Sequence, residues 1–149
     1  MRHIINIMIL ALLCSCASQR KTIAPESVQT VGFSKEAVWR VSTIEGREPM
    51  SPTTITLRFN PETLSFKGNG GCNDFYGQYS AQVAQNKPEY TVYNFKFNNI
   101  GHTRIQCPDN QMKTESRLLT LLPKINSCHI DAYTLIFYHN NKEIIRLER

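Results

Sequence analysis

Cysteine is the residue type in this chain that is best suited to chemistry, and Cys72 is the first candidate. Its thiol could serve as a nucleophile, with His102 or His129 as general base and Asp74 as the group that orients the base. The competing interpretation is a disulfide, because two cysteines in an oxidising compartment form a bridge more simply than a catalytic centre. We favour the disulfide and expect no catalytic residue.

A zinc site is the second chemistry that these residue types allow, with Cys72, Cys107, Cys128 and His129 as ligands. The chain has no Cys-x-x-Cys pair, however, and the adjacent residues Cys128 and His129 would point to opposite faces of a strand. The glycine-rich residues 68–71 also lack the Lys and the Ser or Thr of a phosphate-binding loop. We therefore expect no metal and no other cofactor.

The N-terminus indicates an exported protein. Residues 1–15 contain Arg2, then an apolar run over residues 4–13, and then small residues before a cysteine, which is typical of a secretory signal. As a helix, the ten-residue run would be about 15 Å long, half the thickness of a hydrocarbon core of about 30 Å. The sequence Leu13-Cys14-Ser15-Cys16 resembles a bacterial lipobox, with Cys16 as the residue that accepts the lipid. The mature protein would then be anchored to the membrane without spanning it.

Residues 16–35 are rich in Ser, Gln, Lys and Thr, and this composition is typical of a flexible tether between lipid and domain. The formal net charge of +5 falls to about +4 when Arg2 leaves with the signal, and the basic residues are scattered. No basic run alternates with aromatic residues, so we expect no nucleic-acid partner. Cleavage would leave three cysteines in the exported domain, and at least one of them must remain free.

The domain is organised around the glycine-rich residues 66–79, where Gly70 and Gly71 allow the backbone to turn sharply between two strands. Residues 38–44 predict a first strand that Trp39 anchors in the core. Residues 53–59 alternate between apolar and polar side chains, and the turn signal at residues 60–63 predicts a hairpin. In residues 89–98 the apolar parity changes, which predicts a bulge near Asn94.

One helix is predicted between a cap at Asp109 or Asn110 and a stop at Pro123. Its apolar stripe consists of Met112, Leu118, Leu119 and Leu122, and Glu115 falls inside that stripe. A buried carboxylate needs a partner. We expect Glu115 to form an ion pair with Arg104 or to accept a set of backbone N–H bonds, and so to hold the preceding loop against the glycine-rich crossing. The patterns together predict an α+β fold, a strongly curved antiparallel sheet of about eight strands that forms a half-barrel with one helix packed on it.

Several of these residues in combination resemble the META/HslJ-like domain. The resemblance covers residues 36–147, and we assign residues 36–149 to this domain. It rests on Trp39, Gly70-Gly71-Cys72-Asn73, Phe75, Gly77-Gln78-Tyr79, Gly101, Thr103-Arg104, Cys107, Met112, Glu115 and Leu122. The extra Cys128 and a weak first strand depart from the pattern. We read the best-matched positions as architecture, and we predict that Cys72 and Cys107 are bridged or adjacent while Cys128 is the odd thiol.

The resemblance implies an envelope protein linked to heat shock and antibiotic tolerance, with no established catalytic activity or cofactor. We therefore expect a monomeric, lipid-anchored, non-catalytic protein at the outer membrane, facing the periplasm, that acts in stress response or envelope maintenance and has an envelope protein as partner. The alternative is a periplasmic module that binds a small ligand or a protein, or inhibits one. Solvent-facing Tyr76, Tyr90 and Tyr93 gathered in one cleft would favour the binder, whereas a Cys and a His within hydrogen-bond reach at a pocket would favour an enzyme.

Overall fold

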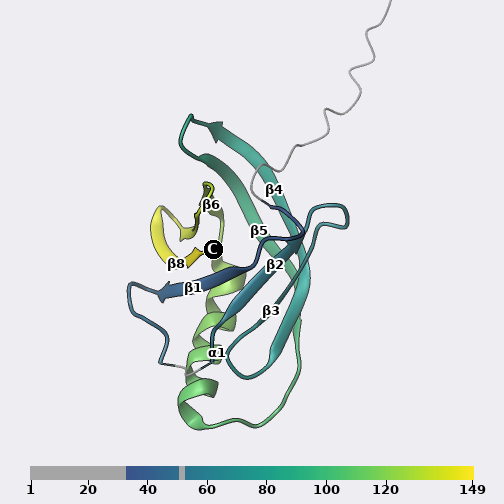
Figure 1. The fold of residues 1–149 in the computed structure, drawn as a ribbon, viewed down its shortest axis with the longest axis vertical. Coiled ribbons are helices and arrows are strands. Elements are labelled where there is room, and N and C mark those ends of the chain that lie inside the picture. Colours follow the sequence, from purple (N-terminus) through teal and green to yellow (C-terminus); the bar gives the residue numbers. More distant parts are fainter. Residues whose placement is uncertain (1–32, 51–52) are drawn as a thin grey trace, which may run out of the picture.

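The computed structural model describes residues 33–50 and 53–149. In this part of the chain eight antiparallel strands pair in sequence order and close into a barrel, with one helix and one short 3₁₀ turn between the fifth and sixth strands (Figure 1). The strands are β1 (Trp39–Ile44), β2 (Thr56–Asn60), β3 (Ser65–Asn69), β4 (Asp74–Asn86), β5 (Thr91–His102), β6 (Ser127–Ile130), β7 (Thr134–His139) and β8 (Lys142–Glu148). The helix α1 is Asp109–Leu121, and the 3₁₀ turn η1 is Leu122–Lys124.

The predicted open half-barrel of an α+β fold is wrong, because the sheet closes and the domain is mostly β. Closure depends on β1, which pairs with β2 on one side and with the last strand, β8, on the other. Val41 lies opposite Leu147, and Ile44 lies opposite Ile145. Closing the sheet pairs the backbone groups that an open sheet would leave at its two edges.

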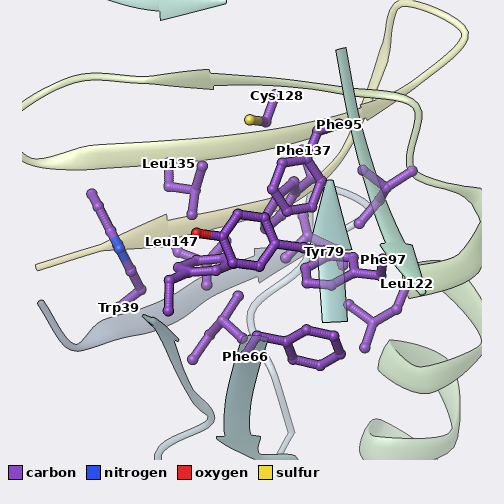
Figure 2. Packing of buried hydrophobic residues seen from close by; sticks show 14 of the residues in the cluster. Trp39, Phe66, Tyr79, Phe95, Phe97, Leu122, Cys128, Leu135, Phe137 and Leu147 are labelled. Atoms are coloured by element: carbon purple, nitrogen blue, oxygen red, sulfur yellow. The ribbon is translucent and has the colours of Figure 1, made fainter. Parts of the chain in front are cut away.

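Large apolar side chains fill the inside of the barrel. Figure 2 shows aromatic rings and aliphatic side chains from distant strands packed together, with Trp39, Tyr79, Phe95, Phe97 and Phe137 among them. An eight-stranded barrel has an interior just wide enough for its own side chains, and this composition is suited to fill it. The prediction that Trp39 is a core anchor is confirmed, since its side chain is fully buried.

Phe33 is a core residue that the sequence analysis did not identify. It lies within the range that we assigned to the tether, yet its side chain is buried. Its ring centroid is 4.8 Å from that of Phe59 and 5.3 Å from that of Tyr93. A single aromatic residue in a polar segment shows no periodicity, so no local pattern predicted this packing.

The β4–β5 hairpin is the longest in the fold and reaches beyond the shorter strands in Figure 1. Tyr93, Phe95 and Phe97 are all buried, so the side chains of β5 keep alternating between the core and the outer face on both sides of Asn94. The bulge predicted near Asn94 is therefore absent from β5. The register instead shifts between Tyr76 and Gln78 and between Val83 and Gln85 of β4.

Helix α1 begins slightly earlier than predicted, and it ends just before the predicted stop at Pro123. Pro108 is the N-cap and makes no side-chain capping bond, while Asp109 lies in the first turn. The helix ends at Leu121, and Pro123 falls within η1. Met112, which we placed in the apolar stripe, is 40% exposed, whereas Leu118 and Leu122 belong to the core. No helix in residues 33–50 and 53–149 has the length and apolar content needed to cross a membrane.

Candidate functional site

The turn between β3 and β4 contains the glycine-rich sequence and is held by its own polar groups. The Gly70 N–H donates to the carbonyl of Asn73 at 2.8 Å, and the Gly71 N–H donates to Asn69 Oδ1 at 2.8 Å. Gly71 has a φ of +99°, a conformation that glycine adopts without steric cost. The Asn69 side-chain amide donates to Asp74 Oδ1 at 2.9 Å and so links the two ends of the turn.

Glu115 of α1 reaches this turn and is bound there by one residue, Asn73. Its Oε2 accepts from the Asn73 backbone N–H at 2.5 Å, and its Oε1 accepts from Asn73 Nδ2 at 2.9 Å. Glu115 is only 6% exposed, so the two bonds replace water that its carboxylate would otherwise hold. An added Cβ on Gly70 would lie 2.8 Å from Glu115 Cγ, which explains why the turn has no side chain at this position.

The other end of the Asn73 amide binds the loop between β5 and α1. Asn73 Oδ1 accepts from Thr103 Oγ1 at 2.8 Å and from the Ile105 N–H at 2.6 Å, and Nδ2 also donates to the Ile105 carbonyl at 3.1 Å. The Asp74 N–H donates to Thr103 Oγ1 at 3.1 Å. One buried asparagine therefore joins the β3–β4 turn, the loop and the helix.

A disulfide closes the same region. Cys72 in the turn is bonded to Cys107 in the loop, with their Cα atoms 6.0 Å apart, and Cys128 is a buried free thiol. The bridge and the Asn73 bonds join the same two segments. We call the set Asn73, Glu115, Thr103 and the Cys72–Cys107 disulfide the clamp.

The structure corrects the predicted partner of Glu115. The ion pairs in the described part of the chain are Lys35–Glu62, Glu45–Arg117 and Glu143–Arg146, and Arg104 is exposed. Arg104 and Glu115 therefore form no ion pair. The loop is held through its Ile105 backbone and the Thr103 hydroxyl, so the alternative that we kept open, backbone N–H donation, describes one of the two bonds to Glu115.

The candidate catalytic and metal-binding side chains either lie apart from one another or already take part in structural contacts. Cys72 is in the disulfide, and burial raises the pKa of the Cys128 thiol far above its ordinary value. His129 is stacked on Tyr90, with ring centroids 5.2 Å apart, and burial followed by the charge of Lys87 lowers its pKa. Within residues 33–50 and 53–149, no three His, Cys, Asp or Glu side chains are grouped to hold a metal ion.

The three tyrosines that we named as a cleft do not share one. Tyr93 is fully buried in the core, Tyr90 packs beside His129, and Tyr76 is 54% exposed on the outer face of β4. Of the three, Tyr76 alone presents a large exposed surface.

Sequence reasoning missed two contributors to these sites. Asn69 organises the turn, and the signal for it was an asparagine directly before a Gly-Gly pair. The second is a pair of cations, Arg58 and Lys67, which lie opposite each other on β2 and β3. The predicted hairpin was the signal for this pair, because a turn at residues 60–63 places the two side chains on the same face of the sheet.

A comparison with protein families matches the META domain over residues 33–149. This chain belongs to the META domain family. The match begins at Phe33, the aromatic residue that packs inside the barrel. A comparison with curated proteins finds no match.

Two solved structures share the fold of this META domain. An NMR structure of a protein from Burkholderia xenovorans is similar with a TM-score of 0.57 and 18% identity, over 78% of this chain and 83% of that one. A second NMR structure is similar with a TM-score of 0.52 and 13% identity, over 76% of this chain and 89% of that one. At these identities the likeness concerns the fold alone.

Proposed function

We propose that this META domain protein is a non-catalytic module of the bacterial cell envelope, anchored by a lipid on Cys16 and acting in stress tolerance or envelope maintenance. The lipobox-like sequence before Cys16 supports the anchor. The lipobox-like sequence and Cys16 lie outside the residues that the structure describes. Membership of the META family supports the domain assignment.

The observation that carries the non-catalytic role is the clamp. Both oxygens of Glu115 accept bonds from Asn73, and the sulfur of Cys72 is bonded to Cys107. Catalysis needs an acid, a base or a nucleophile that can reach a substrate in a pocket. These side chains hold the fold together instead, and the proposed role of the protein therefore lies in its surface.

A second candidate is a module that binds a small ligand. The exposed ring of Tyr76 favours it, because aromatic side chains at the surface commonly mark recognition sites.

Fractionation and complementation test the proposed function together. In a deletion strain, the wild-type gene should restore stress tolerance and the protein should fractionate with membranes. Cys16→Ala should abolish both, whereas the neighbouring change Ser18→Ala should abolish neither. A Cys16→Ala protein that stays in the membrane fraction would contradict the anchor.

The non-catalytic role has its own test. If Cys72→Ser left stability intact yet abolished hydrolysis of an envelope substrate by the purified protein, an enzymatic role would replace the one proposed here.

A further inference from the structure

Four residues form one row across the outer face of the barrel. Arg58 of β2 lies opposite Lys67 of β3, Lys67 lies opposite Tyr76 of β4, and Tyr76 lies opposite Gly101 of β5. β2, β3 and β4 run side by side in Figure 1. The antiparallel pairing places the Cβ atoms of Arg58 and Lys67, and those of Lys67 and Tyr76, about 5 Å apart.

Tyr76 lies flat on the sheet because its partner on β5 has no side chain. An added Cβ on Gly101 would lie 2.8 Å from Cε2 and 3.0 Å from Cζ of the Tyr76 ring. The ring therefore covers the Gly101 backbone with one face, and the 54% exposure of Tyr76 leaves the other face open to solvent. An aromatic ring fixed in this way is a preformed stacking surface.

Arg58 and Lys67 bring two positive charges to the same row. Both side chains are exposed, and like charges directly opposite each other on a sheet are destabilising. Neither takes part in any of the three ion pairs found in the described part of the chain. An anion placed between these two cations would remove the repulsion.

The row borders a shallow cavity of about 390 Å³ whose polar lining is mixed in charge. Its polar side chains are Thr56, Arg58, Lys67, Asn69, Asp74 and Tyr76. The volume lies at the lower end of the range for small-molecule sites, about 300 to 1,000 Å³. Asp74 would repel a bare anion but would accept hydrogen bonds from hydroxyl groups. The cavity therefore matches a ligand that carries both an acid group and several hydroxyls.

We propose that this row binds an acidic sugar, with the sugar ring on Tyr76 and its phosphate or carboxylate between Arg58 and Lys67. Asp74 and Thr56 then face the hydroxyl groups, while the hydrogen bond from the Asn69 amide holds Asp74 in place. An acidic peptide fits less well, because β2, β3 and β4 are paired on both sides and offer no free edge for strand addition. The inference rests on the proposed binding role but not on the lipid, so it is tested with protein in solution.

The first experiment is a titration of the whole mature chain carrying Cys16→Ala, followed by amide NMR shifts. Glucose 6-phosphate and glucuronic acid should give saturable shifts centred on residues 58, 67, 76 and 101. Glucose and inorganic phosphate should bind about tenfold more weakly or worse, since each lacks one half of the recognition, and tenfold corresponds to about 1.4 kcal/mol. Equal binding of inorganic phosphate, or tighter binding of a triglutamate peptide, would overturn the proposal of a sugar site.

Variants then separate the two halves of the site. Arg58→Gln with Lys67→Gln should remove the preference for glucose 6-phosphate over glucose, and Tyr76→Ala should weaken both acidic sugars. The matched controls are Lys96→Gln, an exposed cation on β5, and Tyr133→Ala, a tyrosine that is 74% exposed elsewhere. Both controls should bind like the parent chain. If either control weakened binding as much as the site variants, the row would not be the site.

Gly101→Ala tests the geometry without removing a functional group. The new methyl group should displace the Tyr76 ring and weaken binding about as much as Tyr76→Ala does, while the spectrum stays dispersed and folded. Unchanged binding of glucose 6-phosphate by folded Gly101→Ala protein would refute the stacking role of Tyr76. Failure of these titrations would leave the Cys16 localisation test unaffected.

Discussion

Replacing Glu115 with Gln should destabilise the domain although the two side chains have nearly the same shape. Asn73 presents two donors to this position, its backbone N–H and its Nδ2 group, and the carboxylate accepts one with each oxygen. A glutamine amide has one oxygen and one NH₂ group, so one of the two donors would face another donor. The fold therefore requires a carboxylate here rather than an amide.

The expected loss can be worked out from these contacts. One hydrogen bond to a charged group contributes about 1.5–3 kcal/mol, and the remaining bond weakens when its acceptor becomes neutral. Nδ2 of Asn73 keeps its bond to the Ile105 carbonyl, which limits the cost of the lost partner. We expect Glu115→Gln to lower the free energy of unfolding by about 2–3 kcal/mol, a large part of the 5–15 kcal/mol typical of a domain.

Urea unfolding of the oxidised protein measures this loss. Glu89→Gln is the matched control, because Glu89 is exposed, and it should change the free energy of unfolding by no more than about 0.5 kcal/mol. Hydrogen exchange gives a local readout, since the Ile105 amide donates to the Asn73 side chain and should exchange faster in Glu115→Gln. A loss under about 0.5 kcal/mol for Glu115→Gln would refute the assigned role of the carboxylate.

Three further predictions concern the disulfide, the core and pH. Replacing both Cys72 and Cys107 with Ser should lower the free energy of unfolding by about 4 kcal/mol, the value that the chain-entropy model gives for a sequence separation of 35. Urea unfolding of the variant and of the oxidised parent measures this loss. An unchanged free energy of unfolding would show that the bridge does not constrain the unfolded chain. Phe33→Ala should lower the free energy of unfolding by about 3–5 kcal/mol, as measured by urea unfolding, because the side chain is buried. The same substitution in a flexible tether would leave the free energy of unfolding unchanged. The pKa of His129 is lowered in the fold, so its neutral form is favoured there and its contribution to stability is present above about pH 6.5 and is lost as the pH falls. Urea midpoints at pH 7.5 and pH 5 should therefore differ less for His129→Gln than for the parent, and an equal difference would contradict the assignment.

The sequence alone determined the features that depend on near neighbours. Ile55, Leu57 and Phe59 face the core as their alternation predicts, because successive side chains of a strand point to opposite faces. The sharp turn at Gly70 and Gly71 follows from the conformational freedom of glycine. The burial of Glu115 followed from its place in the helical stripe, and the family followed from the combination of these motifs.

Only the tertiary structure decided which distant groups meet. Closure of the barrel depends on the pairing of β1 with β8, about a hundred residues away along the chain, and no local pattern records a pairing at that separation. For the same reason the nearest cation in sequence, Arg104, proved a poor guide to the partner of Glu115, which is Asn73 in the β3–β4 turn. The Tyr76 surface exists because the register places a glycine opposite it on β5, and register is a property of paired strands rather than of either strand alone.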